Sequence, residues 1–575
     1  MRKSVFATLA LCACILWSLR SEACTNVLVT PGASTDGSSL VSYAADSHWL
    51  YGELAFRKAG KFAQGSRREV IEWDTYVRKG DIAQAESTLQ RVGNMNTSQL
   101  IIAETTWGGR LELMDTTGVM DYGSMIYIAL ERARTAREAI QVMTSLADEY
   151  GYPSEGETFS IADPEEVWIM DLIGKGSDNK GVVWVARRVP DGYICAHANQ
   201  ARIRTFPLDD PENCLYSPDV ISFAREKGYF TGDDKDFSFR EAYCPLDFGT
   251  VRGCDARAWS AFNILCDGVF TWEENGEEHS APAESFLNYA MGYDLAGELP
   301  LFVKPSRKIS VKDVADVMRD HFEGTPMDMR TDAGAGSNAC PYRWRPLTFE
   351  WEGKSYVNER AIATQQTGFW FVGQARGWLP EQIGALIWFG TDDAATSYLN
   401  PIYVGIDSVP ECLAEGNGNL LEYSPTSSFW LNNRISNACY KMYNRMEPYV
   451  RERVDAFENT QIFSEVPRQD SLMLKIYNRH PKGLGARLAQ RRIRKELTKF
   501  TVKTAQDQFA AWTVLEQELL VKFMDGNVKA QNPDGSFKHT DAFAGMPDGL
   551  EYGGQTDKWK EATVKDHGPV LEEKN

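Results

Sequence analysis

The chain has 575 residues, of which 43% are hydrophobic and 25% are charged, and its formal net charge at pH 7 is −19. A strong excess of acidic residues argues against a nucleic-acid-binding surface and favours solubility. The length would allow several domains, but no Ser/Pro/Gly-rich linker, repeat or low-complexity segment divides the chain. We therefore expect a soluble protein with one large apolar core.

The first residues have the three-part layout of a secretory signal. Arg2 and Lys3 give a short positive start, and an apolar run from Val5 to Leu19 follows. Ser21 and Ala23 then place small residues three and one positions before Cys24. We predict that residues 1–23 are a cleaved signal peptide and that the protein is secreted or periplasmic, with no stable membrane insertion after cleavage.

Two other interpretations of this segment stay open. An uncleaved membrane anchor is disfavoured because the apolar run is short for a membrane span. The sequence Leu11-Cys12-Ala13-Cys14 is similar to a lipidation box, but lipidation there would leave Cys24 internal.

Cleavage after Ala23 would make Cys24 the first residue of the mature protein. Such a cysteine carries a thiol and a free α-amine on one residue. The amine has a reference pKa near 8, so it can act as the general base for its own thiol. This pattern makes Cys24 the candidate nucleophile.

The residues after Cys24 predict a β-hairpin. Cys24 to Thr30 is expected to form a strand, residues 31–38 a turn, and Ser39 to Ala45 the returning strand. Pairing about the turn puts Thr30 opposite Leu40 and hence Cys24 opposite Asp46, with Cβ atoms about 5 Å apart. Asp46 is therefore a candidate to orient the new N-terminus; alternatively, it only caps the following segment.

The middle of the chain mixes strand and helix patterns. Leu100–Ala103 predicts a buried strand, and Asp121–Tyr150 predicts a helix. Further strand patterns occupy residues 157–161, 166–172, 182–189 and 193–198. Strands, a helical layer and more strands favour an α+β fold.

The C-terminal part, residues 436–575, differs in character. Residues 437–463 and 486–526 predict helices, and we interpret the region as a helical extension that packs on the domain formed by residues 24–435. The basic cluster Arg491-Arg492-x-Arg494-Lys495 is most simply a solvated helix face.

Short motifs in order along the chain resemble the C69 family of dipeptidases, which are N-terminal-nucleophile (Ntn) hydrolases. The resemblance rests on Cys24-Thr25-Asn26-x-Leu28-Val29, Gly32-Ala33-Ser34-x-Asp36-Gly37-Ser38, Ala45-Asp46-Ser47-His48, Leu130-Glu131-Arg132-Ala133, Phe159-x-Ile161-Ala162-Asp163, Glu166-x-Trp168, Ala198-Asn199-Gln200-x-Arg202-Ile203, Glu359-Arg360-x-Ile362, Gln374-Ala375-Arg376-x-Trp378-Leu379-Pro380 and Trp388-Phe389-Gly390. It implies a four-layer αββα sandwich, hydrolysis of dipeptides through a Cys24 thioester, and no metal or organic cofactor.

The resemblance also suggests two supporting catalytic residues. Asn199 matches an asparagine that stabilises the oxyanion in related hydrolases; the local pattern alone instead favours a strand-end turn residue. An arginine near the nucleophile is expected some fifty residues later, where Arg257 fits the Arg-x-Trp pattern better than Arg252. A guanidinium there would favour the thiolate; the alternative is a surface ion pair.

Further polar residues are candidates for substrate binding. His48 follows Asp46 by two residues, and Glu104 and Thr105 end the strand that begins at Leu100. A papain-like Cys–His dyad using His48 or His197 is not required by the family mechanism. The seven histidines include no His-Glu-x-x-His motif, so a zinc peptidase has little support.

The leading hypothesis is an exported cysteine dipeptidase acting on small peptides. The first alternative is an Ntn acylase that cleaves bile-salt or N-acyl amino-acid amides. The second is a non-catalytic glycan- or peptide-binding protein that uses its aromatic residues as platforms. A homo-oligomer is neither indicated nor excluded by the sequence.

Overall fold

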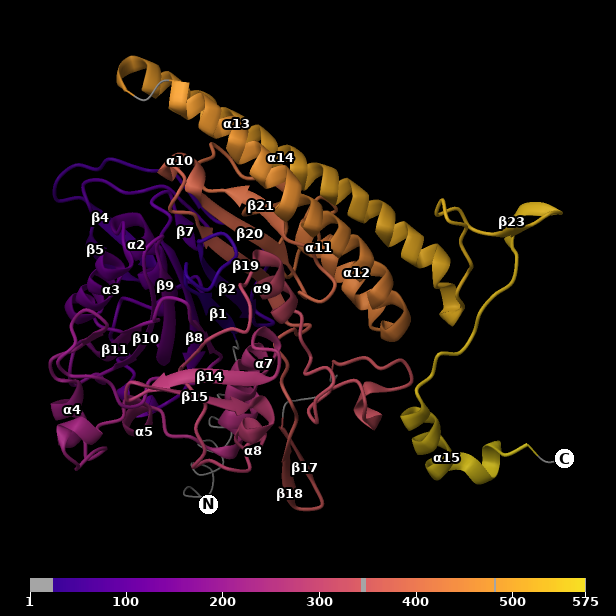
Figure 1. Ribbon diagram of the computed structural model, residues 1–575, viewed down its shortest axis with the longest axis horizontal. Coiled ribbons are helices and arrows are strands. Elements are labelled where there is room, and N and C mark those ends of the chain that lie inside the picture. Colours follow the sequence, from indigo (N-terminus) through magenta and orange to yellow (C-terminus); the bar gives the residue numbers. More distant parts are fainter. Residues whose placement is uncertain (1–23, 343–347, 480–481, 574–575) are drawn as a thin grey trace, which may run out of the picture.

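Two antiparallel sheets form the centre of the protein (Figure 1). The structure is a computed structural model that describes residues 24–342, 348–479 and 482–573. The predicted signal peptide, residues 1–23, lies outside the described residues. The first sheet has seven strands in the order β16 (Phe302–Val303), β12 (Ile194–His197), β1 (Asn26–Val29), β2 (Ser39–Asp46), β19 (Thr367–Ala375), β20 (Ala385–Thr391) and β21 (Asn400–Tyr403).

The second sheet has eight strands and faces the first. Its order is β13 (Cys214–Tyr216), β11 (Val182–Arg188), β10 (Val167–Gly174), β9 (Gly156–Ala162), β8 (Ile101–Trp107), β7 (Met95–Asn96), β6 (Arg91–Val92) and β3 (Phe56–Arg57). Four two-stranded hairpins complete the described strands: β4 (Arg67–Ile71) with β5 (Arg78–Ala83), β14 (Val269–Glu274) with β15 (Glu277–Pro282), β17 (Thr348–Trp351) with β18 (Lys354–Val357), and β22 (His539–Thr540) with β23 (Phe543–Pro547).

Successive side chains of a strand point to opposite faces of its sheet, and in this way the strands contribute to two apolar layers. Val41 of β2 and Ile101 of β8 belong to the core between the sheets. The next residue of β8, Ile102, points to the other face and packs with Leu130 and Ile140 of the helices that cover it. The predicted α+β class is thereby confirmed.

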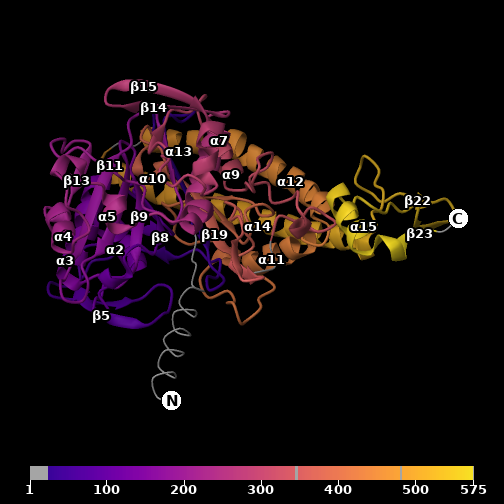
Figure 2. The same cartoon turned by 90° about the horizontal axis from the view of Figure 1, so that it is seen from below.

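The described helices lie on the outer faces and beyond them. Their bounds are α2 (Tyr122–Arg132), α3 (Ala136–Tyr150), α4 (Val220–Glu226), α5 (Phe239–Tyr243), α6 (Phe248–Thr250), α7 (Ala256–Leu265), α8 (Leu287–Ala290), α9 (Val311–Val317), α10 (Glu381–Gly384), α11 (Ser428–Cys439), α12 (Tyr443–Thr460), α13 (Val466–Arg479), α14 (Gly483–Lys522) and α15 (Asp557–Leu571). Helices α2 and α3 cover the eight-stranded sheet, while α7 contacts β12, α9 contacts β19, and α14 lies along β21. Figure 2 shows α15 and the β22–β23 hairpin at the end of the molecule opposite α4 and β13.

Two details of the sequence prediction were wrong. The hairpin register is shifted by one residue, because Leu40 pairs with Val29 and not with Thr30. The Thr30 carbonyl instead accepts the backbone N–H groups of Ala33 and Ser34, so the turn begins one residue earlier than expected. The predicted helix over 121–150 is two helices, and Thr135 caps the second by accepting the Glu138 N–H.

The C-terminal helices are more extensive than the two predicted segments. Helix α11 begins at Ser428, before the expected boundary at residue 436, and α13 was not predicted. Helices α13 and α14 run side by side over the edge of the seven-stranded sheet (Figure 1). Within the described part of the chain, no helix is long and apolar enough to cross a membrane.

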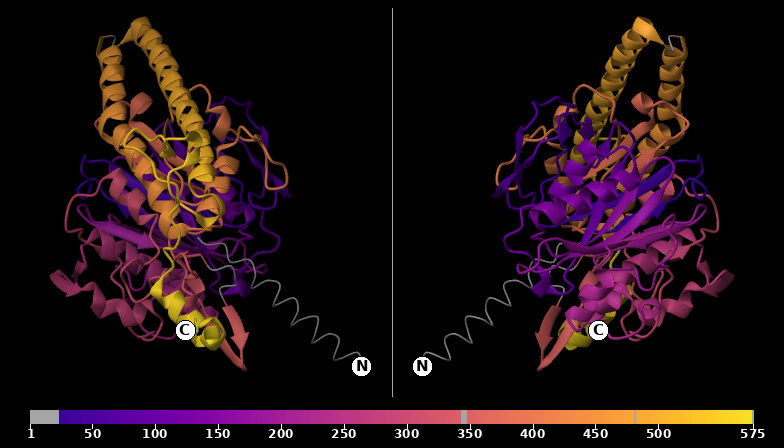
Figure 3. Two further views of the ribbon diagram at one scale, coloured as in Figure 1. Left: turned by 90° about the vertical axis from the view of Figure 1, so that its right-hand side faces the viewer. Right: turned by 90° about the vertical axis from the view of Figure 1, so that its left-hand side faces the viewer.

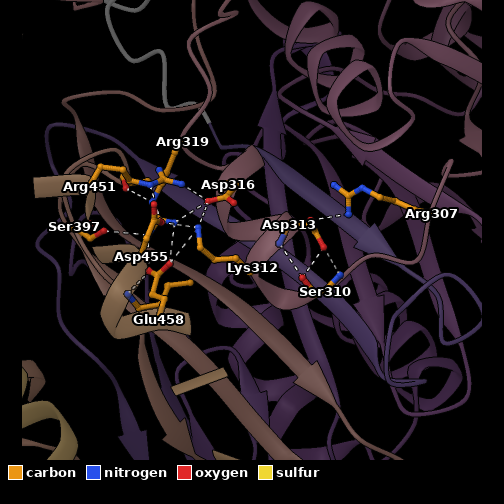
Figure 4. A network of polar contacts seen from close by, with 12 residues as sticks. Arg307, Ser310, Lys312, Asp313, Asp316, Arg319, Ser397, Arg451, Asp455 and Glu458 are labelled. Carbon is orange, nitrogen blue, oxygen red and sulfur yellow. Dashed lines mark hydrogen bonds and ion pairs between the residues drawn. The ribbon is translucent and has the colours of Figure 1, made fainter. Parts of the chain in front are cut away.

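A buried ion pair fastens α12 to the sheet layer (Figure 4). Arg319, which follows α9, donates to both carboxylate oxygens of Glu458 on α12, at 2.5 and 3.1 Å, and both side chains are buried. Arg319 also donates to the carbonyls of Ala394 and Ser397, next to β20. Lys312 and Arg451 extend the network toward the surface.

We predict that Arg319→Met destabilises the protein by about 3–5 kcal/mol, because Glu458 would remain buried without its main partner. The double variant Arg319→Met/Glu458→Met should recover most of this loss. Urea unfolding followed by fluorescence measures both. Arg307→Met, which breaks the more exposed pair with Asp313, is the control and should cost about 1 kcal/mol or less. Equal losses for Arg319→Met and Arg307→Met would contradict the role of the buried pair.

Candidate active site

The thiol of Cys24 lies between the two sheets, just before β1. Its side chain is 4% exposed. The Sγ atom is 3.6 Å from the Tyr43 hydroxyl on β2 and 3.6 Å from Glu104 Oε1 on β8. Tyr43 donates to the same Glu104 oxygen at 2.8 Å, so one hydrogen-bonded cluster joins thiol, phenol and carboxyl across the sheets.

Arg257 holds the backbone of Cys24 from the first turn of α7. Its guanidinium donates to the Cys24 carbonyl at 2.8 Å and to the Thr25 hydroxyl at 2.9 Å. A second nitrogen donates to Asn199 Oδ1 at 2.8 Å, and the whole side chain is buried. The planar guanidinium suits this multipoint contact, which fixes Cys24 relative to β12 and α7.

Asn199 follows β12 in a left-handed conformation with φ +48°. Asparagine adopts this region more readily than most residues. Its side-chain nitrogen donates to the Thr106 carbonyl at 2.6 Å while its oxygen accepts from Arg257. The Asn199 amide is thus held by two hydrogen bonds, and the guanidinium of Arg257 bridges it to the backbone of Cys24.

Asp46 ends β2 and interacts with Cys24, although the observed register, continued along the hairpin, places Ala45 and not Asp46 opposite Cys24. Its Oδ1 accepts the Thr367 hydroxyl at 2.7 Å. Its Oδ2 is buried and has no hydrogen-bond partner among the described residues. Burial raises the pKa of Asp46 to about 7, and the charges of Arg360 and Arg257 together with the Thr367 hydrogen bond limit the rise.

The surroundings of Cys24 favour the neutral form of its thiol. Burial raises the pKa of Cys24 well above its usual value, and the nearby carboxylates of Glu104 and Asp46 add to the rise. Burial likewise raises the pKa of Glu104 to about 7. A buried thiol of this kind needs a base close to it before it can attack a carbonyl.

The remaining predicted residues are placed differently. His48 is exposed and lines a cavity of about 970 Å³ that also has Glu53, Trp73 and Phe369 in its wall. Thr105 is buried and bonds to His197 Nδ1 at 2.8 Å, so it does not join the Glu104 cluster.

His197 is a structural residue in this arrangement. Its Nε2 lies 2.7 Å from the Ser160 hydroxyl, and burial lowers its pKa to about 3. Arg252 pairs with Glu359 and donates to the Met291 carbonyl, while Arg257 contacts Cys24.

Tyr43 and Arg360 were not among the predicted site residues. Tyr43 lies on the predicted returning strand three residues before Asp46, and nothing in the local pattern assigns it to the thiol. Arg360 is buried, and its charge acts on Asp46 and Cys24. The signal for Arg360 was present, since it belongs to the segment Glu359-Arg360-x-Ile362 that carries the family resemblance.

Among the described residues, no group of histidine, cysteine and carboxylate side chains is arranged to hold a metal ion.

Comparison with known proteins identifies the family. The family model described as peptidase family C69 matches residues 61–455. The chain belongs to peptidase family C69. It is 24% identical over 407 residues to a probable dipeptidase of Salmonella dublin. The alignment covers 67% of this chain and 81% of that protein. It is 24% identical over 431 residues to a probable dipeptidase B of Lactococcus lactis, covering 72% and 80%.

A dipeptidase A of Lactobacillus helveticus is 20% identical over 468 residues, covering 77% of this chain and 86% of that protein. The chain is therefore a C69 peptidase, and the family assignment confirms the resemblance seen in the sequence.

We predict that Arg257→Lys lowers kcat/KM for peptide hydrolysis by about 100-fold, because a lysine ammonium cannot hold Cys24 and Asn199 together and a small displacement at a reacting centre has an effect of this size. Steady-state kinetics measures the change, with circular dichroism to verify the fold. Arg252→Lys is the matched control, since it keeps a cation beside Glu359, and it should leave kcat/KM close to wild type. The reverse ranking would assign the site to Arg252.

Proposed function

We propose that this C69 peptidase is an exported dipeptidase in which Cys24, exposed as the N-terminal residue by removal of residues 1–23, is the nucleophile. The observation that carries the proposal is the environment of Cys24: its thiol is buried, its backbone carbonyl accepts a hydrogen bond from Arg257, and the neighbouring Asp46 carboxyl group has an unsatisfied oxygen. We also infer that the helix, sheet, sheet and helix layers are the Ntn-hydrolase sandwich, that residues 24–435 form the peptidase domain, and that residues 436–575 are an extension of it.

The unsatisfied oxygen of Asp46 supports a free α-amine at Cys24. Buried carboxyl oxygens normally have a hydrogen-bond donor, and Asp46 Oδ2 has none among the described residues. The Cys24 thiol interacts with the Asp46 backbone, and the charge of Asp46 acts on the thiol, so the two residues are neighbours. Cleavage before Cys24 would create an amine at this place, which supplies both the missing donor and the base that the buried thiol lacks.

The proposed reaction needs only Cys24, its α-amine, the oxyanion donors, the substrate and one water molecule. The α-amine takes the thiol proton, and the thiolate attacks the peptide carbonyl to form a tetrahedral oxyanion, which the Asn199 amide and backbone N–H groups stabilise. Collapse breaks the C–N bond, and the departing amine takes the proton that the α-amine received. Water then attacks the thioester, and its hydrolysis releases the acyl part as a carboxylic acid and restores the thiol.

The cavity beside the site is the proposed substrate pocket. Its wall includes Phe369, whose ring centroid is 5.7 Å from that of Tyr43, so the cavity adjoins the thiol cluster. Glu53 lines it with a half-buried carboxylate that has no ion pair among the described residues. A carboxylate in this position suits the free amino group of a dipeptide. The relatives named dipeptidase support the same substrate class.

An Ntn acylase is the second candidate function. Phe369, Phe389 and Leu420 give the same cavity apolar wall area that an acyl chain could occupy. Both functions cleave an amide, but they differ in the acyl group that they recognise: a dipeptidase binds an acyl residue with a free ammonium, while an acylase binds an apolar acyl chain without one.

We predict that Cys24→Ala lowers kcat for dipeptides by about 1000-fold or more, because the nucleophile is lost. Hydrolysis of a dipeptide panel followed by amine release measures it. Cys412→Ala is the control: this buried thiol follows β21 and interacts with Ser428 and Glu411 rather than with the Cys24 cluster, and its loss should leave kcat within the same order of magnitude. Full turnover by Cys24→Ala would exclude the mechanism.

We predict that free dipeptides are hydrolysed faster than their N-acetyl forms and that Glu53→Gln raises KM for the free dipeptides by about tenfold, since it removes one charge-assisted hydrogen bond. KM for an N-acetyl dipeptide should not change. Glu69→Gln is the matched control, because Glu69 is more exposed and already pairs with Arg78. Preference for the N-acetyl forms would favour the acylase.

A further inference from the structure

The outward face of α14 carries a line of basic and apolar side chains that we call the basic stripe. Its members follow one another at intervals of three or four residues, so they share one face of the helix. They are Leu484, Leu488, Arg491, Lys495 and Lys499. The opposite face is buried through Ala489, Ile493 and Leu497. All five members of the stripe are exposed.

The cations of the basic stripe lack ionic partners. Among the described residues, none of Arg491, Lys495 and Lys499 makes an ion pair, although the same helix pairs Lys503 with Asp507. Arg494, which lies off the stripe, has Asp407 at 3.7 Å. The stripe is thus a concentration of free positive charge on a protein whose formal net charge is −19.

The apolar members of the basic stripe are exposed to solvent. Leu484 is 73% exposed and Leu488 is 57% exposed, and both lie in the first turns of α14. In Figure 3 the adjoining ends of α13 and α14 project beyond the two sheets, and Figure 1 shows the same ends at the upper left. The basic stripe therefore begins at a projecting end of the molecule, which can contact a flat surface before the two sheets do.

We propose that the basic stripe adsorbs the protein reversibly to the surface of an anionic lipid bilayer. The three cations would lie at the level of the lipid phosphates, and the two leucines would enter the boundary between headgroups and acyl chains, as in interfacial amphipathic helices. If this were only a solvated helix face, its cations would be explained, but the two exposed leucines in line with them would not.

The acidic body does not prevent this contact. Charges more than a Debye length apart are screened, and that length is about 8 Å at physiological ionic strength. A projecting helix end can therefore approach anionic lipid while most of the acidic residues stay beyond that distance. The bound protein would keep its catalytic residues away from the bilayer, because the Cys24 cluster is buried between the sheets and not on α14.

Co-sedimentation of the full chain with vesicles tests the proposal. The anionic vesicles contain equal parts of phosphatidylglycerol and phosphatidylcholine, and vesicles of pure phosphatidylcholine provide the neutral surface. Binding should be confined to the anionic vesicles and should weaken as salt is raised. The triple variant Arg491→Gln/Lys495→Gln/Lys499→Gln should bind more weakly by about fivefold for each cation removed. Leu484→Ser/Leu488→Ser should also weaken binding, with less dependence on salt.

The matched control removes three exposed lysines from another helix. Lys558→Gln/Lys560→Gln/Lys565→Gln changes the net charge equally on α15, and it should bind anionic vesicles almost as well as wild type. Unchanged peptidase activity shows that each variant is folded. Absence of vesicle binding, equal binding to neutral vesicles, or equal weakening by both triple variants overturns the proposal. A loss of self-association in the α14 variant, without vesicle binding, would assign the stripe to a second copy of this acidic chain.

Discussion

The contact of Arg257 with the Cys24 carbonyl is the interaction on which the rest of the site depends. Cys24 precedes the first described strand, so β1 alone would not fix its position. Arg257 does so from α7, and the same guanidinium fixes Asn199 beyond the end of β12. Because the side chain is fully buried, these hydrogen bonds act in a low-dielectric interior where they are strong and where a lost partner is costly. The proposed nucleophile and the candidate oxyanion donor are thus held by one group.

Burial of ionisable groups gives the site its pH behaviour. The pKa of Asp46 is raised from its ordinary value of 3.8 to about 7 by burial. A raised acid pKa means that the folded state binds the proton more tightly than the unfolded chain does. The resulting stabilisation is complete below pH 3.8 and is lost as the pH rises through about 7. At neutral pH, close to this pKa, the buried Asp46 carboxyl is partly ionised, and an adjacent α-ammonium would stabilise its charged form.

Much of the fold follows from local pattern, whereas the site depends on contacts between distant segments. The four strand patterns between residues 157 and 198 all appear as strands, because apolar alternation and turn residues act locally. The turn that shifted the Val29–Leu40 pairing could not be deduced, since it depends on backbone hydrogen bonds within the turn. Glu104 was named only as a pocket residue, and its contact with Cys24 requires the two sheets to face each other. Tyr43 was missed for the same reason.

The proposed mechanism requires Cys24 to work with its own α-amine. This requirement is tested by the intact mass and N-terminal sequence of active protein recovered from its natural host. We expect a chain that begins at Cys24. Activity in protein that retains any residue before Cys24, or that is lipidated at Cys14, would contradict it, because the nitrogen of Cys24 would then be an amide and could not accept the thiol proton.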